Sequence, residues 1–264
     1  MNEIPLIVEI DENEKDEAQI FVDGTIDGQA YRFLLDSGAA RTTVIADDQL
    51  LTYTAIGKDD TTGAFSKNKD ELIQVKEVSL GPISKKDLVL ARTTENVQHK
   101  TNLLGMDFLK DHRLHFYFDQ NRIEVDADNQ PKETLPLTLG SRFHPYVDVD
   151  FGKTRAKAVW DTGASITVVD MNLIKSHPHC FQEIGSSTGT DSTGTSMETP
   201  MFIMDTTMIG NKEFPPHKVA GFDLSHINAS TEIPMHMILG YSTIRKANWY
   251  FDVPARKWAV LKRL

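Results

Sequence analysis

A short motif occurs twice in this 264-residue chain, and its repetition limits the possible folds more than any other pattern. Each copy is an apolar run that ends in Asp-[Ser/Thr]-Gly-Ala: Phe33-Leu-Leu-Asp-Ser-Gly-Ala39 and Ala158-Val-Trp-Asp-Thr-Gly-Ala164. One copy would be a weak signal, because short motifs are common. Two copies predict a site that forms when the fold brings Asp36 and Asp161 together.

The similarity between the two copies extends beyond the motif. At an offset of 125 residues, the separation of the two aspartates, segment 20–45 aligns with segment 145–170 without a gap. Further on, Leu103-Leu-Gly105 matches Ile238-Leu-Gly240 at an offset of 135, so the second copy holds ten more residues between its landmarks. An aromatic triplet before Asp follows in both copies: Phe116-Tyr-Phe-Asp119 and Trp249-Tyr-Phe-Asp252. Three landmarks in the same order predict an internal duplication.

Size and composition favour two lobes of ordinary size. We expect domains at 1–129 and 130–264, with the boundary in the polar segment 126–133. Hydrophobic residues make up 40% of the chain, which is enough for buried cores. The net charge of −10 argues against nucleic acid or an anionic membrane as the main partner, because both attract a basic surface.

Cysteine usage and the N-terminus indicate a cytoplasmic protein. Cys180 is the single cysteine, so no disulfide can form within the chain. The first ten residues carry acid where a signal peptide carries base, and no apolar run is long enough to span a bilayer.

The apolar runs predict an all-β protein. They are short, rich in β-branched or aromatic residues, and bounded by Gly, Asp or Asn. Asp27-Gly28 and Gly152-Lys153 predict hairpin turns. Helix is expected only at 105–111 and 240–246, as two turns each. The predicted strands include 19–22, 31–35, 72–75, 87–90, 146–149 and 201–204.

Two aspartates in such loops suit acid–base chemistry. A carboxylate at the end of an apolar strand needs donors from the following loop, and the Ser/Thr hydroxyl and Gly amide supply them. Two carboxyls held close together cannot easily both ionise, so they share one proton. One then acts as a base and the other as an acid, which is the pair needed to activate water against a peptide carbonyl.

These residues resemble the pepsin and retropepsin aspartic peptidases. The likeness rests on the Asp-[Ser/Thr]-Gly-Ala motif and the apolar-apolar-Gly element, each present twice, and covers roughly 18–125 and 143–261. Retropepsins are built from two identical chains, so this sequence looks like two retropepsin-like units fused in tandem. The resemblance implies a bilobal pepsin-like architecture, with two β-barrel lobes related by a pseudo-two-fold axis.

The same resemblance implies roles for the residues of the two motifs. Asp36 and Asp161 would be the catalytic pair, and the two loops around them would be stabilised across the lobe interface. The loop-stabilising and substrate-positioning residues would be Ser37, Gly38, Ala39, Thr162, Gly163 and Ala164.

This sequence also departs from the pepsin-like pattern. Ala39 and Ala164 stand where pepsin-like enzymes usually have Ser or Thr. Loss of a hydroxyl donor at both positions should leave the pair less acidic, so we expect a working pH nearer neutral than that of pepsin. Arg41 is opposite the apolar Ile166; it would pair with an acid at the rim or bias the pocket toward acidic substrate residues.

Two segments are candidates for mobile hairpins over the site, as an alternative to ordinary surface loops or a linker. They are 60–67 and the Ser/Thr/Gly-rich stretch 186–197. An extended peptide would add to such hairpins by main-chain hydrogen bonds. The candidate flap residues are Thr62, Gly63, Ala64, Thr193, Gly194 and Thr195.

The sequence therefore predicts a single-chain aspartic endopeptidase that acts on peptides or proteins as a monomer, without cofactor or metal. His177-Pro-His179-Cys180 has metal-capable side chains, but no further cluster at ligand spacing, and a solvated turn is expected there. The first rival is a catalytically silent peptide- or protein-binding module on the same fold. The second is a structural role in which each unit pairs with another chain.

Overall fold

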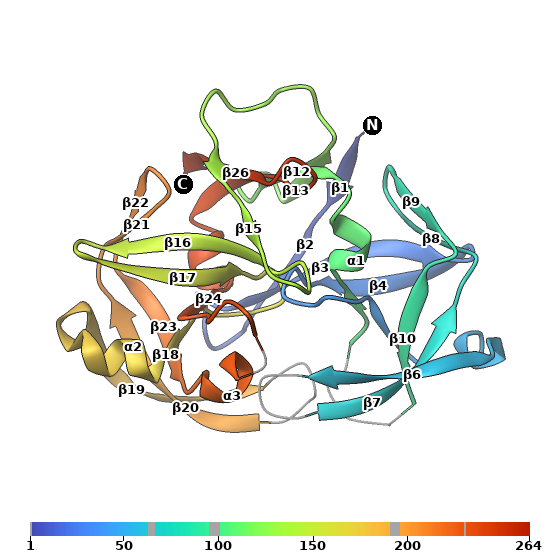
Figure 1. Cartoon of the computed structure of the whole chain (residues 1–264), viewed down its shortest axis with the longest axis horizontal. Helices are drawn as coiled ribbons and strands as arrows, with labels where there is room; N and C mark the ends of the chain where they lie inside the picture. Colours follow the sequence, from blue (N-terminus) through green and yellow to red (C-terminus); the bar gives the residue numbers. More distant parts are fainter. Residues whose placement is uncertain (1, 63–66, 95–100, 191–195, 230) are drawn as a thin grey trace.

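The computed structural model describes residues 2–62, 67–94, 101–190, 196–229 and 231–264. Strands account for 53% of the residues, and the helices are few and short, which confirms the all-β prediction. Figure 1 shows two curled sheets side by side, with a third group of strands across the top. The two curled sheets fit two retropepsin-like β-barrel lobes.

The first lobe is a ten-stranded sheet. Its strands are β2 (Ile7–Ile10), β3 (Ala18–Ile26), β4 (Gln29–Leu35), β5 (Thr43–Ile45), β6 (Ala55–Thr62), β7 (Lys67–Gln74), β8 (Glu77–Leu80), β9 (Ile83–Lys86), β10 (Val89–Thr93) and β11 (Leu103–Leu104). Their order is β6-β7-β10-β5-β11-β4-β3-β8-β9, and β2 pairs with β3 outside this path.

The second lobe is also a ten-stranded sheet. Its strands are β15 (Thr138–Leu139), β16 (Pro145–Phe151), β17 (Thr154–Trp160), β18 (Val168–Asp170), β19 (Phe181–Thr190), β20 (Ser196–Met204), β21 (Thr207–Ile209), β22 (Lys212–Phe214), β23 (His217–Phe222) and β24 (Met237–Leu239). The order β19-β20-β23-β18-β24-β17-β16-β21-β22, with β15 on β16, is that of the first lobe strand for strand.

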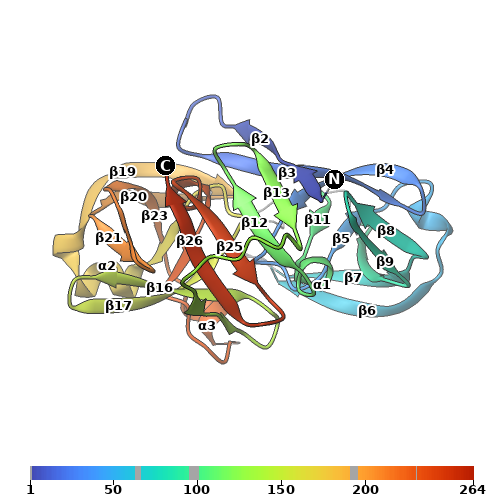
Figure 2. The same cartoon turned by 90° about the horizontal axis from the view of Figure 1, so that it is seen from above.

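A six-stranded sheet joins the lobes. It combines β1 (Glu3–Pro5), β12 (Arg113–Tyr117), β13 (Arg122–Val125), β14 (Leu135–Pro136), β25 (Ala247–Asp252) and β26 (Lys257–Arg263). The order is β1-β13-β12-β25-β26-β14, so three strands of the first half of the chain lie beside three of the second half, and β12 pairs with β25 where they meet (Figure 2). The predicted boundary at 129/130 falls between β13 and β14, and the division into domains at that point stays a prediction.

An aromatic cluster lies where this sheet meets the lobes. Trp160, the last residue of β17, is 1% exposed, and its ring lies 4.7 Å from Phe116, 4.6 Å from Phe251 and 5.9 Å from Trp249 between centroids. Burial of such large rings is a major source of stability. Because Asp161 follows directly, this cluster fixes the position of the second aspartate.

Both predicted hairpin turns are present. Asp27 and Gly28, between β3 and β4, have φ of 48° and 85°, the left-handed values that a two-residue hairpin turn requires. Gly152, between β16 and β17, has φ of 69°. The predicted strand 87–90 is wrong at its start: Asp87 has φ of 53° and lies in the turn between β9 and β10.

The helices differ from the expectation. Helices α1 (Met106–Leu109) and α4 (Tyr241–Ile244) span four residues each instead of two turns, because the chain enters β12 and β25 within a few residues of their ends. The sequence analysis did not predict α2 (Met171–Ser176), which is capped by the Asp170 carboxylate, or α3 (Ser225–Asn228). Short 3-10 turns lie at η1 (Leu50–Thr52) and η2 (Pro178–Cys180). No helix in the described ranges is long and apolar enough to cross a membrane.

Candidate active site

The two motif aspartates occupy equivalent places in the two lobes. Asp36 follows β4, and its backbone N–H donates to the Leu104 carbonyl at 3.0 Å. Asp161 follows β17, and its N–H donates to the Leu239 carbonyl at the same distance. Each Asp is therefore held against the strand that ends in the apolar-apolar-Gly element. We call 36–42 the Asp36 loop and 161–167 the Asp161 loop.

Hydrogen bonds between Ser37 and Thr162 join the two loops. The Ser37 N–H donates to Thr162 Oγ1 at 3.0 Å, and the Thr162 N–H donates to Ser37 Oγ, also at 3.0 Å. The Ser37 hydroxyl in turn donates to the Trp160 carbonyl at 2.8 Å. Both side chains are buried, with 3% and 1% exposure. These bonds are strong constraints because a buried donor left without a partner is costly.

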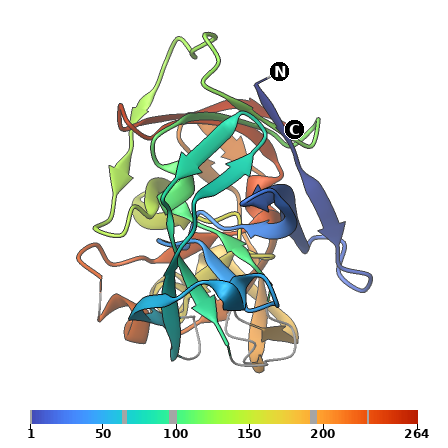
Figure 3. The same cartoon turned by 90° about the vertical axis from the view of Figure 1, so that its right-hand side faces the viewer.

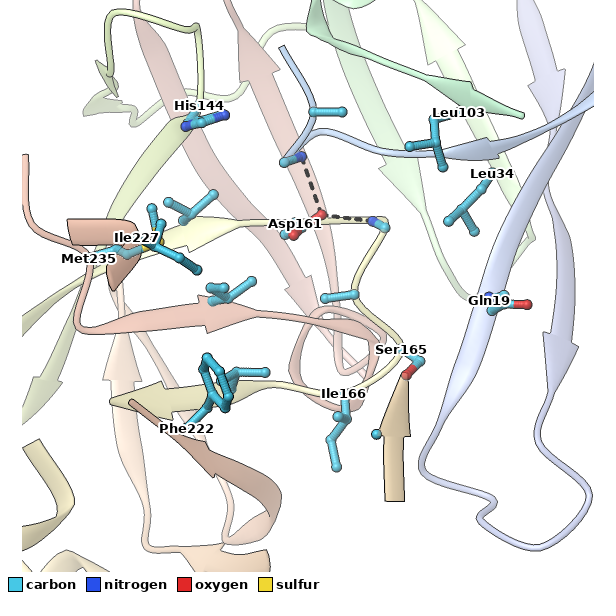
Figure 4. Close-up of a pocket in the computed structure, with 18 of the residues that line it drawn as sticks. Gln19, Leu34, Leu103, His144, Asp161, Ser165, Ile166, Phe222, Ile227 and Met235 are labelled. Carbon is cyan, nitrogen blue, oxygen red and sulfur yellow. Dashed lines mark hydrogen bonds between the residues drawn. The ribbon is translucent and has the colours of Figure 1, made fainter. Parts of the chain in front are cut away.

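The two carboxyl groups hydrogen bond to each other, and backbone amides of the two loops donate to both of them. Asp161 Oδ1 accepts from the N–H of Gly163 at 2.8 Å and from that of Gly38 at 3.2 Å (Figure 4). Each glycine lies against the opposite carboxyl: a Cβ at Gly38 would overlap Asp161, and one at Gly163 would lie 2.5 Å from Asp36 Cγ. Glycine is required at both positions because no side chain fits there.

The surroundings of the two carboxyls differ. Burial and then the charge of Asp161 raise the pKa of Asp36 well above its usual range. Burial also raises the pKa of Asp161, but its bonds from the Gly163 amide and from Asp36 oppose this. Because both pKa values are raised and the two carboxyls cannot easily both ionise side by side, the pair shares one proton. The pair then contains one acid and one base in hydrogen-bond contact.

The apolar-apolar-Gly elements hold the loops from behind. The carbonyls of Ala39 and Ala164 accept from the N–H of Met106 and of Tyr241, both at 2.8 Å. The N–H of Gly105 and of Gly240 donates to a threonine hydroxyl of the adjacent loop, in both cases at 3.1 Å. A Cβ at either glycine would overlap the backbone of that loop, so these elements pack against the loops without side chains between them.

Those threonines, Thr42 and Thr167, are structural residues to which the sequence analysis assigned no role. Thr42 Oγ1 donates to the half-buried carboxyl of Asp107 at 2.7 Å, whereas Thr167 Oγ1 contacts Thr243 Oγ1 at 2.6 Å. Thr243 also contacts Nε2 of the buried His217 at 2.6 Å. The matched spacing of the two threonines was visible in the sequence, but their different partners were not.

A pocket of about 1460 Å³ opens beside the aspartates and is lined by both halves of the chain. Its lining includes Gly38 and Asp161, and also Arg41. Arg41 Nε pairs with Asp59 Oδ2 at 3.1 Å, with the side chains 39% and 42% exposed. Of the two alternatives raised by the sequence, an ion pair at the rim is the one observed.

The candidate flaps are only partly described. Strands β6 and β7 form an antiparallel hairpin, and so do β19 and β20. Thr62 is the last residue of β6, whereas Gly63, Ala64, Thr193, Gly194 and Thr195 lie outside the described residues. Their role as flaps stays a prediction.

The histidine-rich segment near Cys180 has local partners. His177 Nε2 contacts Thr154 Oγ1 at 2.9 Å, and Cys180 is a buried free thiol. Within the described ranges, no three or more His, Cys, Asp or Glu side chains are grouped so that they could hold a metal ion.

Comparison with known proteins matches residues 22–111 to the family model described as gag-polyprotein putative aspartyl protease. The matched segment contains the Asp36 loop and the Leu103-Leu-Gly105 element. A search of curated proteins finds no match for the chain.

Proposed function

We propose that this protein is an aspartic endopeptidase of the retropepsin-like family, as the family match over residues 22–111 supports. One observation carries the proposal: two carboxyls from separate halves of the chain share a hydrogen bond, in loops tied together by buried bonds. Water activated between Asp36 and Asp161 would hydrolyse a peptide held in the adjoining pocket.

The proposed reaction uses each carboxyl in both protonation states. Asp161 takes a proton from water, and the water oxygen attacks the peptide carbonyl carbon, while Asp36 gives its proton to the carbonyl oxygen. The resulting gem-diol then collapses: one hydroxyl returns a proton to Asp36, the C–N bond breaks, and Asp161 protonates the leaving nitrogen. One water is consumed and both carboxyls return to their starting states.

Holding the loops rigidly supports this chemistry, because a small displacement of reacting groups lowers the rate strongly. The reciprocal bonds between Ser37 and Thr162 restrict motion of one loop against the other. Because Gly38 lies against Asp161 and Gly163 against Asp36, neither carboxyl is covered by a side chain at these positions of the opposite loop, so a substrate backbone can approach.

The test is cleavage of an unbiased peptide library across pH by the wild type, Asp36→Asn and Asp161→Asn. We expect cleavage by the wild type and a loss of at least about a thousandfold in each variant, since the acid–base pair is broken. Asp23→Asn, an exposed aspartate on β3, is the matched control and should cleave normally. Cleavage that survives either loop substitution would sink the mechanism.

The rival reading is a peptide-binding module, and the same experiment separates the two. Binding of library peptides without cleavage by the wild type at any pH would favour the module. We also propose that the active species is a monomer, because one chain supplies both aspartates. A native mass of one chain in a cleaving sample would agree with this, whereas activity confined to a dimer would contradict it.

A further inference from the structure

A tight turn at 140–144 carries a histidine to the candidate active site. The N–H of Gly140 donates to the His144 carbonyl at 3.1 Å, and the N–H of Phe143 donates to the Gly140 carbonyl at 2.9 Å. Phe143 has φ of 65°, a left-handed value that closes the turn. Strand β16 begins at the next residue, Pro145. The position of His144 is therefore fixed by the turn on one side and by the strand on the other.

This turn belongs to the second lobe but contacts the first. It reaches the end of α1, where Lys110 places its ammonium 4.3 Å from the centre of the Phe143 ring (Figures 1 and 3). His144 is half-buried and lines the pocket together with Asp161 (Figure 4). The turn thus brings a ring of the second lobe to the Asp36 loop of the first.

The ring of His144 is bonded to that loop. Burial and then Arg142 lower the pKa of His144, whereas a hydrogen bond between its ring and the backbone of Gly38 raises it. A bond that raises the pKa of a histidine favours the protonated ring, so a ring N–H is the donor and the Gly38 carbonyl is the acceptor. The other backbone group of Gly38, its N–H, donates to Asp161 Oδ1 at 3.2 Å.

These two bonds hold Gly38 from both sides. Its N–H belongs to the peptide unit before the glycine, and its carbonyl belongs to the peptide unit after it. Glycine has more backbone freedom than any other residue, and fixing both neighbouring peptide units removes that freedom. Gly38 also lies directly against the carboxyl of Asp161, because a Cβ there would overlap it. The hold of His144 on the Gly38 carbonyl therefore acts on the amide that supports Asp161.

The first lobe has a different residue at the equivalent position. Gln19 precedes His144 by 125 residues, the offset of the two aspartates, and it is exposed. Asp161 receives one amide from its own loop, that of Gly163 at 2.8 Å, and one from the opposite loop, that of Gly38. His144 is bonded to the loop that supplies the amide from the other lobe.

We propose that His144 is a positioning residue of this site: its ring holds the Gly38 carbonyl and thereby keeps the Gly38 N–H on the carboxyl of Asp161. The inference rests on the proposed endopeptidase function, because that carboxyl is one of the acid–base pair. An N–H that donates to a carboxylate favours its ionised form, so this bond helps the pair to lose one of its two protons. A loosely held loop would also misplace the reacting carboxyl, and small displacements lower rates strongly.

The test compares the wild type with His144→Leu, His144→Asn and His144→Gln. Loss of the ring N–H in His144→Leu should lower kcat by about tenfold to a hundredfold, with KM changed by less than about threefold. An amide N–H can replace either ring N–H, so one of the two amide variants should keep kcat within about threefold of the wild type. His179→Leu, an exposed histidine outside the pocket lining, is the matched control and should be unaffected. A wild-type kcat in His144→Leu, or no recovery in either amide variant, would refute the positioning role.

The pH profile of kcat/KM separates the bond from the charge of the ring. A weaker amide bond to Asp161 raises the pKa at which the pair loses its first proton, so the acid limb of His144→Leu should move to higher pH by about half a unit to one unit. Removal of a protonated ring would move it in the same direction, but the amide variants keep a donor without that charge. The nearby charge of Arg142 is present in all of them. One amide variant should therefore restore the limb, and an equal shift in all three variants would overturn the proposal.

A measurement without substrate separates this inference from the function on which it rests. Carbon-13 NMR of the aspartate carboxyls, with Asp161→Asn to assign the signal, follows the titration of the pair in the wild type and in His144→Leu. A higher pKa in His144→Leu, with no peptide cleaved by the wild type, would retain the positioning role and refute the endopeptidase. Identical titrations would overturn the positioning role, whether or not the wild type cleaves peptides.

Discussion

Replacing Ser37 by Ala should destabilise the whole molecule, because one hydroxyl serves both lobes. Its Oγ accepts from the Thr162 N–H at 3.0 Å and donates to the Trp160 carbonyl at 2.8 Å, and Ser37 itself is only 3% exposed. The substitution leaves two buried backbone groups without this partner, at a cost of about 1–3 kcal/mol each. We therefore expect the free energy of unfolding to fall by about 2–5 kcal/mol.

The partner substitution Thr162→Val keeps the side-chain shape but removes the acceptor of the Ser37 N–H. One buried donor is orphaned, so the expected loss is about 1–3 kcal/mol. Since both hydroxyls belong to one network, the double variant should lose less than the sum of the single losses, with a coupling of about 0.5–3 kcal/mol. Urea unfolding of the four proteins, followed by tryptophan fluorescence, measures these quantities.

Ser79→Ala provides the matched control, because its hydroxyl makes a 3.3 Å bond to Ser84 at the surface. Its effect should stay within about 0.5 kcal/mol. If Ser37→Ala costs no more than this control, or if the losses of the double variant simply add, the cross-lobe bonds do not stabilise the site as argued.

Three further expectations concern the dyad, a buried histidine and a glycine. The profile of kcat/KM against pH should be bell-shaped with an optimum above about pH 3, and an optimum below about pH 3 would contradict the shared proton. An acid whose pKa is raised by folding contributes stability that is lost as the pH rises through the raised pKa, so Asp36→Asn should raise the free energy of unfolding at pH 7. A variant less stable than the wild type at pH 7 would count against the raised pKa of Asp36. Burial lowers the pKa of His217 from 6.5 to about 4, so the wild type should lose up to about 3 kcal/mol as pH falls across that window, and denaturant titrations of His217→Gln should lack this slope. Gly105→Ala should cost about 3 kcal/mol or more, because its Cβ would lie 2.7 Å from the backbone of the Asp36 loop, whereas in Gly57→Ala the nearest atom is 3.5 Å away; equal thermal midpoints for these two variants would be inconsistent with the packing described.

Local sequence signals predicted those parts of the fold that depend on neighbouring residues. Asp27-Gly28 has the backbone freedom of a hairpin turn wherever it occurs, and the structure has that turn. The lengths of helices α1 and α4 were overestimated, because the chain enters strands β12 and β25 of the six-stranded sheet a few residues after each helix begins. That sheet pairs strands more than a hundred residues apart, so no local pattern reveals where it starts.

The candidate site divides in the same way. A motif written twice was enough to predict that Asp36 and Asp161 come together, because a duplicated lobe brings equivalent loops to the same place. The glycines in both motifs followed from the need for close backbone approach. Neither conclusion required knowledge of which side chains lie nearby.

Only the tertiary structure decided the surroundings of the two aspartates. Most of the amides that donate to each carboxyl belong to its own loop, but the Gly38 amide at Asp161 and the contact between the two carboxyls join segments distant in sequence. The fold likewise brings Asp11, from the loop before β3, and Arg142, from the loop before β16, into the lining of one pocket, although both belong to stretches that look like ordinary polar loops. The sequence by itself determined which residues form the pair, because equivalent motifs in a duplicated chain fold alike. The fold determined how the two halves differ, because partners such as Asp107 at Thr42 and Thr243 at Thr167 are brought in from distant parts of the chain.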